Sequence, residues 1–181
     1  MATESKPIEL GVSCANFNLP GVDGKNHSLN DYQSSKVLVI AFTCNHCPYV
    51  QAYESRLNDL AQNYKSKGVS FVAINANDSQ SHPDDSFPKM KERAKTLNFH
   101  FDYLHDESQA VAKSFNAACT PEFYVYDQQR KLRYHGRLDD NQKDIASVKK
   151  TYLKDAIEDL LVGKDPRETQ TSAIGCSIKW K

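Results

Sequence analysis

The sequence has no surplus of charge of either sign and no long apolar run. Lysine plus arginine and aspartate plus glutamate both number 23 among 181 residues. This balance offers no basic patch to a phosphate backbone, so we expect no nucleic-acid partner. No stretch approaches the roughly 20 apolar residues of a membrane helix, and residues 1–20 lack the apolar segment of a signal peptide. We therefore predict a cytoplasmic protein without a membrane partner.

The chain also lacks repeats, low-complexity tracts and flexible linkers. Glycine and proline occur only seven times each, and they do not gather into a segment that would separate two domains. A chain of this length can bury roughly 70% of its unfolded surface around one core. We therefore predict a single domain over residues 1–181, in which residues 163–181 form an irregular tail because they show no hydrophobic period.

The cysteines do not form the even set that is typical of a secreted disulfide scaffold. There are five, and we expect most of them to be thiols in a cytosolic protein. Two stand in Cys44-Asn45-His46-Cys47. No second C-x-x-C follows, and the histidine pair His100 and His105 lies too far along for the spacing of a zinc finger. We interpret the motif as a redox pair, with a zinc half-site or a chance match as the alternatives, and predict neither a metal nor a cofactor.

The cysteine motif lies between an expected strand and an expected helix. Residues Lys36 to Thr43 form the continuous β-branched and aromatic run of a buried parallel strand, and apolar residues recur at helical spacing from Tyr49 to Tyr64. The other expected elements are a hairpin of Asn16–Leu19 and Asn26–Leu29, a strand Val69–Ala76, a loop Asn77–Pro88, helices Met90–Leu97 and Ala110–Phe115, a hairpin of Glu122–Tyr126 and Leu132–His135, and a helix Tyr152–Leu161. This order predicts an α/β fold with a central mixed β-sheet, helices on both faces, an N-terminal β-hairpin extension and a C-terminal tail.

This position gives the motif a chemical role. The first turn of a helix offers unpaired N–H groups that stabilise a thiolate, and we expect Cys44 to receive that stabilisation and act as the nucleophile. Cys47, one turn on, is then the resolving thiol, and Pro48 is tolerated in the first helical turn. His46 can lower the pKa of Cys44 further and make the disulfide more oxidising, although a solvated histidine at the helix end is the alternative.

Beyond this motif, the chain resembles the thioredoxin superfamily over nearly its whole length, and in particular the redoxin (AhpC/TSA-like) branch. It is most similar to peroxiredoxin-like proteins that carry a thioredoxin C-x-x-C, and the histidine before the second cysteine resembles protein disulfide isomerase and Dsb-type oxidants. The resemblance rests on Cys44-Asn45-His46-Cys47, Asn77-Asp78, Pro83-Asp84-Asp85-Ser86-Phe87, Cys119-Thr120-Pro121-Glu122-Phe123, Gly136-Arg137-Leu138-Asp139-Asp140 and Gly175-Cys176-Ser177-Ile178-Lys179-Trp180.

The resemblance implies further site residues. Pro121 is expected to be a cis-proline facing the cysteine pair, with Thr120 offering backbone groups to an extended substrate; a trans proline that opens the next strand is the alternative. Gly136 is expected at the end of the next strand, close to the site, with Arg137 nearby. These four residues form the expected substrate-binding set.

The sequence departs from the residue patterns of both peroxiredoxins and thioredoxins. Peroxiredoxins place their peroxidatic cysteine at the position of Cys47 and support it with proline, threonine and arginine, where this chain has Ile40, Cys44 and, near the last position, Pro121. Thioredoxins place a buried acid where this chain has Leu38. The candidates for proton transfer to Cys47 are therefore other groups, namely Glu122, His135 and Asp139.

Three cysteines lie outside the motif. Cys119 and Cys176 are candidate accessory redox thiols, with a packed core cysteine and an anchored tail as the respective alternatives, and Cys14 is expected to be structural.

From these features we predict a thiol-disulfide oxidoreductase that acts on a disulfide-containing protein or a small thiol or disulfide, with an unidentified thiol as electron donor. One alternative is a peroxiredoxin-like thiol peroxidase with an antioxidant role. The other is a Sco-like copper chaperone in which His135 supplies a distant ligand. The sequence leaves the oligomeric state open.

Overall fold

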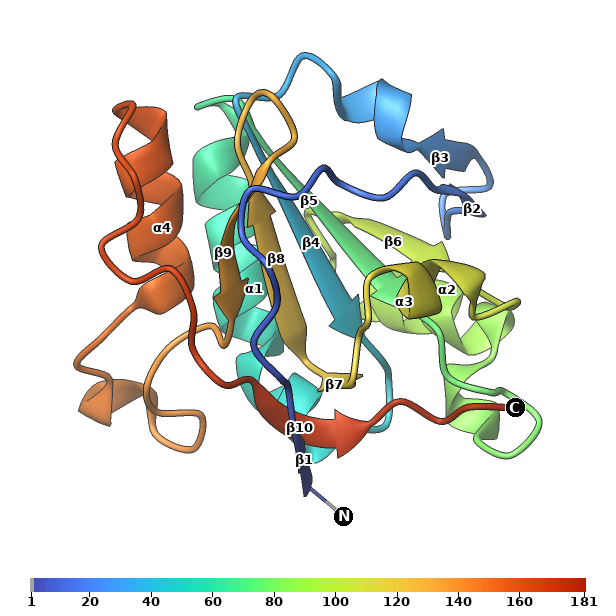
Figure 1. Ribbon diagram of the computed structural model, residues 1–181. Helices are drawn as coiled ribbons and strands as arrows, with labels where there is room; N and C mark the ends of the chain where they lie inside the picture. Colours follow the sequence, from blue (N-terminus) through green and yellow to red (C-terminus); the bar gives the residue numbers. More distant parts are fainter. Residues whose placement is uncertain (1) are drawn as a thin grey trace.

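A five-stranded mixed sheet forms the centre of the computed structural model, which describes residues 2–181 (Figure 1). Its strand order is β6-β5-β4-β8-β9. The strands are β4 (Val37–Thr43), β5 (Val69–Asn75), β6 (Asp102–His105), β8 (Glu122–Tyr126) and β9 (Leu132–Gly136). Strand β4 runs parallel to β5 and antiparallel to β8, so the predicted combination of a parallel unit and a later hairpin is confirmed.

Strand β4 is buried on both faces, as its continuous apolar run predicts. On one face, Val37, Val39 and Ala41 pack against α1 (Pro48–Lys65) and α4 (Tyr152–Leu161). On the other face, alternate residues of β4 pack against the N-terminal segment and α3 (Ala110–Ser114). Helix α2 (Phe87–Thr96) covers β5 and β6 through Met90. Helices thus lie on both faces of the sheet. The cysteine motif directly follows β4, the central strand.

The N-terminal hairpin is formed by β2 (Asn18–Pro20) and β3 (Asn26–Ser28), as predicted. Three short 3₁₀-helices complete the helical elements, at Leu29–Tyr32, Pro83–Asp85 and Ile145–Ser147. Strand β6 has no counterpart in the sequence prediction, because it is a short edge strand with Asp102 and His105 at its ends. In residues 2–181, no helix combines the length and the apolar character that crossing a bilayer requires.

The prediction of an irregular tail is wrong for its last part. Residues Ile174–Ser177 form strand β10, the central strand of a second, three-stranded sheet. Strand β10 pairs antiparallel with β1 (Ala2–Glu4) on one side and with β7 (Cys119–Thr120) on the other. In Figure 1 it crosses the end of the molecule where β7 and the start of α1 lie. Both strands that pair with β10 are remote in sequence, so no local pattern predicts it.

Candidate redox site

Cys44 and Cys47 occupy the connection between β4 and α1. Strand β4 ends at Thr43 and α1 begins at Pro48, which confirms the expected context of the motif. Cys47 is the N-cap residue of α1, and its side chain makes no capping hydrogen bond. Cys44 and Cys47 lie in one small buried cluster with Val50, and all five cysteines are free thiols.

The surroundings shift the pKa values of the two thiols in opposite directions. The neighbouring Cys47, burial and the negative charge of Asp85 raise the pKa of Cys44. The neighbouring thiols of Cys44 and Cys176 lower the pKa of Cys47, against the effect of burial. Because α1 starts at Pro48, Cys47 adjoins the free N–H groups at the helix start more closely than Cys44 does.

Both sulfurs are almost completely covered, since Cys44 is 1% and Cys47 0% exposed. Thr120 contacts both of them: its Oγ1 lies 3.3 Å from Cys44 Sγ and its carbonyl oxygen lies 3.4 Å from Cys47 Sγ. The Thr120–Pro121 peptide bond is cis, as the resemblance implies. The structure thus brings Cys44, Cys47 and the Thr120–Pro121 loop together.

His46 is fixed by a buried carboxylate that the sequence analysis did not assign a role. Its Nδ1 lies 2.5 Å from Oδ2 of Asp85, whose side chain is fully buried. Three more N–H groups donate to the same carboxylate: the backbone N–H of Asn45 at 2.5 Å, and the side-chain amides of Asn75 and Asn77 at 3.2 and 2.9 Å. Asp85 therefore orients His46 and the motif backbone at once.

A sequence signal for Asp85 did exist. Strands β4 and β5 are parallel, with Thr43 opposite Asn75, so the segments that follow them meet at one edge of the sheet. Asn75, Asn77 and Asp85 all lie at or after the end of β5. A search for polar residues after β5 would have found them.

Donor atoms of Cys44, His46 and Asp85 lie within 4.8 Å of one another, close enough to surround a metal ion. Each oxygen of Asp85, however, already accepts hydrogen bonds from protein N–H groups. A carboxylate satisfied in this way serves better to orient an imidazole beside a thiol than to coordinate a cation. His135, which the copper alternative requires, is 1% exposed and bonded through Nε2 to Glu122 at 2.7 Å.

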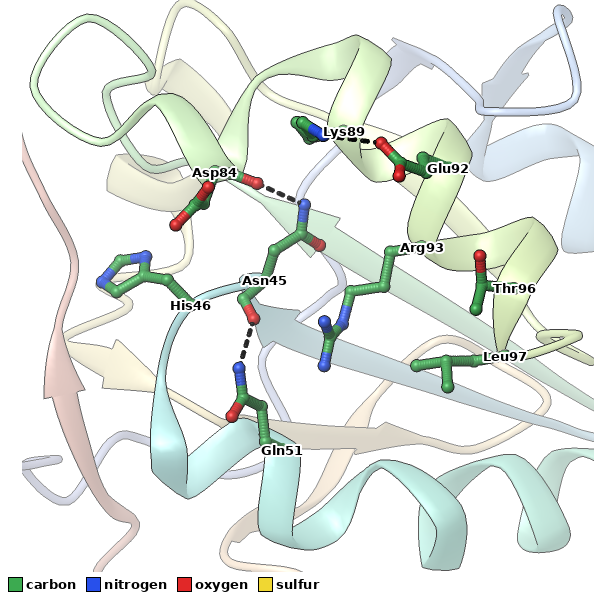
Figure 2. A pocket seen from close by; sticks show the side chains of 9 residues that line it. All are labelled: Asn45, His46, Gln51, Asp84, Lys89, Glu92, Arg93, Thr96 and Leu97. Atoms are coloured by element: carbon green, nitrogen blue, oxygen red, sulfur yellow. Dashed lines mark hydrogen bonds and ion pairs between the residues drawn. The ribbon is translucent and has the colours of Figure 1, made fainter.

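A polar hollow of about 310 Å³ opens beside the motif (Figure 2). Asn45 and His46 border it on one side, and Lys89, Glu92 and Arg93 of α2 border it on the other. Asn45 is itself held by the carbonyl of Asp84 and the side chain of Gln51 (Figure 2). His46 is 24% exposed, so the hollow reaches the motif at Asn45 and His46.

Gly136 and Arg137 both contact the chain segment that leads to β10. A side chain at Gly136 would overlap Thr171, and Arg137 Nε donates to the carbonyl of Ser172 at 2.9 Å. Gly136 ends β9, as the resemblance implies. The role of both residues in binding substrate stays a prediction.

The two accessory cysteines differ sharply. Cys119 Sγ faces Glu122 Oε2 at 3.8 Å and the carbonyl of Ala173 at 3.7 Å, and burial with the charge of Glu122 raises its pKa. These contacts favour an unreactive core thiol. Cys176 instead packs against the buried cluster of Cys44, Cys47 and Val50. The proton-transfer candidates are also engaged, since Glu122 pairs with His135, and Asp139 lies 2.5 Å from Arg56 Nη1.

The family follows from a match that covers the sheet and the motif together. The AhpC/TSA family model matches residues 10–135. The chain belongs to the AhpC/TSA family. Residues 10–135 contain both cysteines of the motif and the cis-proline loop, so the AhpC/TSA match includes the site described above.

Three proteins are similar to this AhpC/TSA member in sequence or in structure. An uncharacterised conserved protein from Geobacillus kaustophilus has a crystal structure that is 45% identical, with a TM-score of 0.95, and the match covers 100% of this chain and 97% of that one. Thiol-disulfide oxidoreductase ResA from Bacillus thuringiensis subsp. konkukian is 24% identical over 132 residues, 72% of this chain and 70% of that protein. The solution structure of a putative thioredoxin from Neisseria meningitidis is 20% identical, with a TM-score of 0.66 over 84% of this chain and 91% of that one. The fold is thus thioredoxin-like.

The lowered pKa of Cys47 leads to a spectroscopic prediction. Because Cys47 keeps its charge at a pH where an ordinary cysteine is protonated, the reduced protein should show thiolate absorbance in the far ultraviolet at neutral pH. The absorbance should fall only as the pH drops through the lowered pKa, and it should vanish at neutral pH when urea unfolds the chain. Cys47→Ser should abolish it and Cys14→Ser should keep it. Equal absorbance of wild type and Cys47→Ser would contradict this charge distribution.

Proposed function

We propose that the protein is a thiol-disulfide oxidoreductase that cycles Cys44 and Cys47 between dithiol and disulfide. The observation that carries this proposal is that the two buried thiols pack together at the start of α1, where Thr120 of the cis-proline loop contacts both sulfurs. Membership in the AhpC/TSA family and the similarity to a protein named thiol-disulfide oxidoreductase support it. The substrate class is a disulfide, either in a protein or in a small molecule, and a second thiol returns the electrons.

In the reductive direction, Cys44 attacks the substrate disulfide, because its sulfur lies beside His46, which borders the open hollow. A bond forms between Cys44 Sγ and one substrate sulfur, and the other substrate sulfur leaves as a thiolate. Cys47 then attacks Cys44 Sγ, which releases the reduced substrate and leaves the Cys44–Cys47 disulfide. Two electrons pass from the cysteine pair to the substrate.

The proton of Cys44 has a defined acceptor. Because the pKa of Cys44 is raised and that of Cys47 is lowered, Cys44 becomes a thiolate when its proton passes to the neighbouring Cys47. His46, oriented by Asp85, stands beside the leaving substrate thiolate as a proton donor. Cys44 is thus a nucleophile with a proton acceptor beside it, and Asp85 is the carboxylate that orients the nearby histidine.

A thiol peroxidase is the second candidate, because one observation favours it. The pKa of Cys47, which stands at the peroxidatic position of the family, is lowered as a peroxidatic thiolate requires. The supporting donors are absent from the sequence, since Ile40, Cys44 and Pro121 occupy their places. Of the nearby guanidinium groups, Arg56 binds Asp139 and Arg93 binds Glu54. We therefore place peroxide reduction behind disulfide exchange.

Reduction of insulin and of glutathione disulfide tests the proposal. Wild-type protein should accelerate both reactions with dithiothreitol as donor, and Cys44→Ser or Cys47→Ser should lower each rate by at least about 100-fold, because either change removes one half of the exchanging pair. Cys14→Ser is the matched control, since Cys14 lies in the core on the other face of the sheet. If wild type reduced these disulfides no faster than Cys44→Ser and Cys47→Ser do, the proposal would be wrong.

The same variants assign the order of attack. Cys47→Ser should trap the substrate as a mixed disulfide on Cys44, because the resolving thiol is missing. A mixed disulfide trapped instead on Cys47 of the Cys44→Ser protein would reverse the order, and rapid oxidation of Cys47 by hydrogen peroxide would favour the peroxidase.

A further inference from the structure

The tail strand β10 occupies the backbone edge that the resemblance assigns to substrate. It pairs antiparallel with β7, with Cys176 opposite Thr120 and Ser177 opposite Cys119. The residue before the cis-proline therefore has its pairing edge filled by this chain itself. A peptide substrate and β10 cannot lie on this edge together.

The fit of β10 against this edge is close. A side chain on Gly175 would overlap the carbonyl oxygen of Thr120, so only glycine allows the strand to approach so closely. Gly175 is buried, and β1 covers the other edge of β10. Strand β10 is thus seated in the site rather than lying loosely over it.

This seating places a third thiol beside the pair. Cys176 packs against Cys44, Cys47 and Val50. The thiols of Cys47 and Cys176 shift each other's pKa, that of Cys47 downward and that of Cys176 upward. Cys176 is partly exposed, whereas Cys47 is completely covered. The thiols of Cys44, Cys47 and Cys176 therefore belong to one cluster, in which Cys176 comes from the tail strand.

We propose that Cys176 is a third redox thiol, which exchanges with the Cys44–Cys47 disulfide to form a Cys47–Cys176 disulfide, and that β10 acts as an internal substrate strand. This inference rests on the proposed function, which supplies the Cys44–Cys47 disulfide. In the exchange, Cys176 Sγ attacks Cys47 Sγ. The Cys47–Cys176 bond forms and the Cys44–Cys47 bond breaks. Cys44 leaves as a thiolate and takes up the proton that Cys176 released, so no external oxidant or reductant takes part.

Oxidation of the pair itself prepares Cys176 for this attack. In the reduced protein, burial and the charged Cys47 raise the pKa of Cys176 to about 11. When Cys47 enters a disulfide, its negative charge disappears and one of these two causes is removed. Lys179 lies close enough to lower the pKa of Cys176. The third thiol is therefore less reactive in the reduced protein than in the oxidised one.

The exchange also gives the electron donor a point of entry. Cys44 and Cys47 are both almost completely covered, whereas Cys176 is partly exposed. A Cys47–Cys176 disulfide places one sulfur on the partly exposed tail strand, where the donor thiol can attack Cys176 and release Cys47. Cys47 is a good leaving group, because its surroundings lower its pKa. Substrate then enters past His46 and the electron donor enters at the tail.

Disulfide mapping tests the inference. The purified full chain is oxidised with glutathione disulfide, quenched in acid, alkylated, digested and analysed by mass spectrometry. Wild type should contain both the Cys44–Cys47 and the Cys47–Cys176 disulfides. Cys44→Ser should collect in the Cys47–Cys176 form, and Gly175→Ala should lose that form while it keeps the Cys44–Cys47 disulfide. Ser177→Ala, a neighbouring tail substitution, should behave as wild type, and Cys14→Ser controls for nonspecific thiol pairing.

Turnover provides a second readout. With glutathione as donor, Cys176→Ser should lower the steady-state rate of disulfide reduction by about tenfold, because the donor loses its point of entry. A wild-type protein that forms the Cys44–Cys47 disulfide but never the Cys47–Cys176 disulfide, and that turns over at the rate of Cys176→Ser, would overturn the inference and leave the proposed function intact. A wild-type protein that forms neither disulfide and reduces no substrate would overturn the proposed function itself.

Discussion

Asp85→Asn is expected to lower the free energy of unfolding by about 3 kcal/mol, although the change replaces a single atom. The carboxylate of Asp85 accepts N–H groups on both oxygens, from Asn45 and Asn75 on one and from His46 and Asn77 on the other. Asparagine has one oxygen and one amide group, so at least one oxygen site would become a donor facing other donors. Because the side chain is fully buried, water cannot relieve this conflict.

Urea unfolding of the reduced protein measures this loss. Asp84→Asn is the matched control, since Asp84 is exposed and contributes only its backbone carbonyl to Asn45. It should change stability by less than about 0.5 kcal/mol. Asp85→Asn should also slow disulfide reduction, because His46 would lose the partner that orients its ring. Equal unfolding midpoints for the two variants would show that Asp85 is not the organising group of the site.

Glu122→Ala is expected to cost still more, about 4 kcal/mol of unfolding free energy. Glu122 lies directly after the cis-proline and is 1% exposed. Its carboxylate accepts the backbone N–H groups of Ala118 and Cys119 at 2.8 and 3.1 Å, the hydroxyl of Tyr124 at 2.8 Å and Nε2 of His135 at 2.7 Å. Alanine would leave these buried donors without an acceptor and add a cavity.

Chemical denaturation and hydrogen exchange both measure this effect. Glu122→Gln retains one acceptor oxygen and should cost clearly less than Glu122→Ala, whereas Glu107→Ala, an exposed acid, should be neutral. Exchange of the backbone amides of Ala118 and Cys119 should accelerate in Glu122→Ala, because their acceptor is removed. A stability loss below about 1 kcal/mol would mean that water or another group replaces the carboxylate.

Local sequence patterns predicted the parts of the fold that local physics determines. The apolar run of β4, the helical period of α1 and the proline at its first position locate the cysteine motif within one or two residues. The order of strand, helix and later hairpin then predicts the mixed sheet. These features depend on spacing within a single segment, which a sequence displays directly.

The missing parts all depend on contacts between remote segments. Strand β10 exists because β1 and β7 flank it, and its residues Ile174 to Ser177 show no period of their own. The role of Asp85 depends on the parallel register of β4 and β5, and the lowered pKa of Cys47 depends on Cys44 and on the remote Cys176. The sequence analysis located the helix start correctly, but it could not show which side chains from other segments meet there.

The pairing of β1 with β10 also ties the site to both ends of the chain. Residues near those ends, Ala2 and Cys176, face each other in one short ladder, and the other edge of the same strand is joined to Thr120. Loss of the β1 pairing would leave β10 held by β7 alone. The position of Cys176 beside the cysteine pair therefore depends on a contact made by the first residues of the chain.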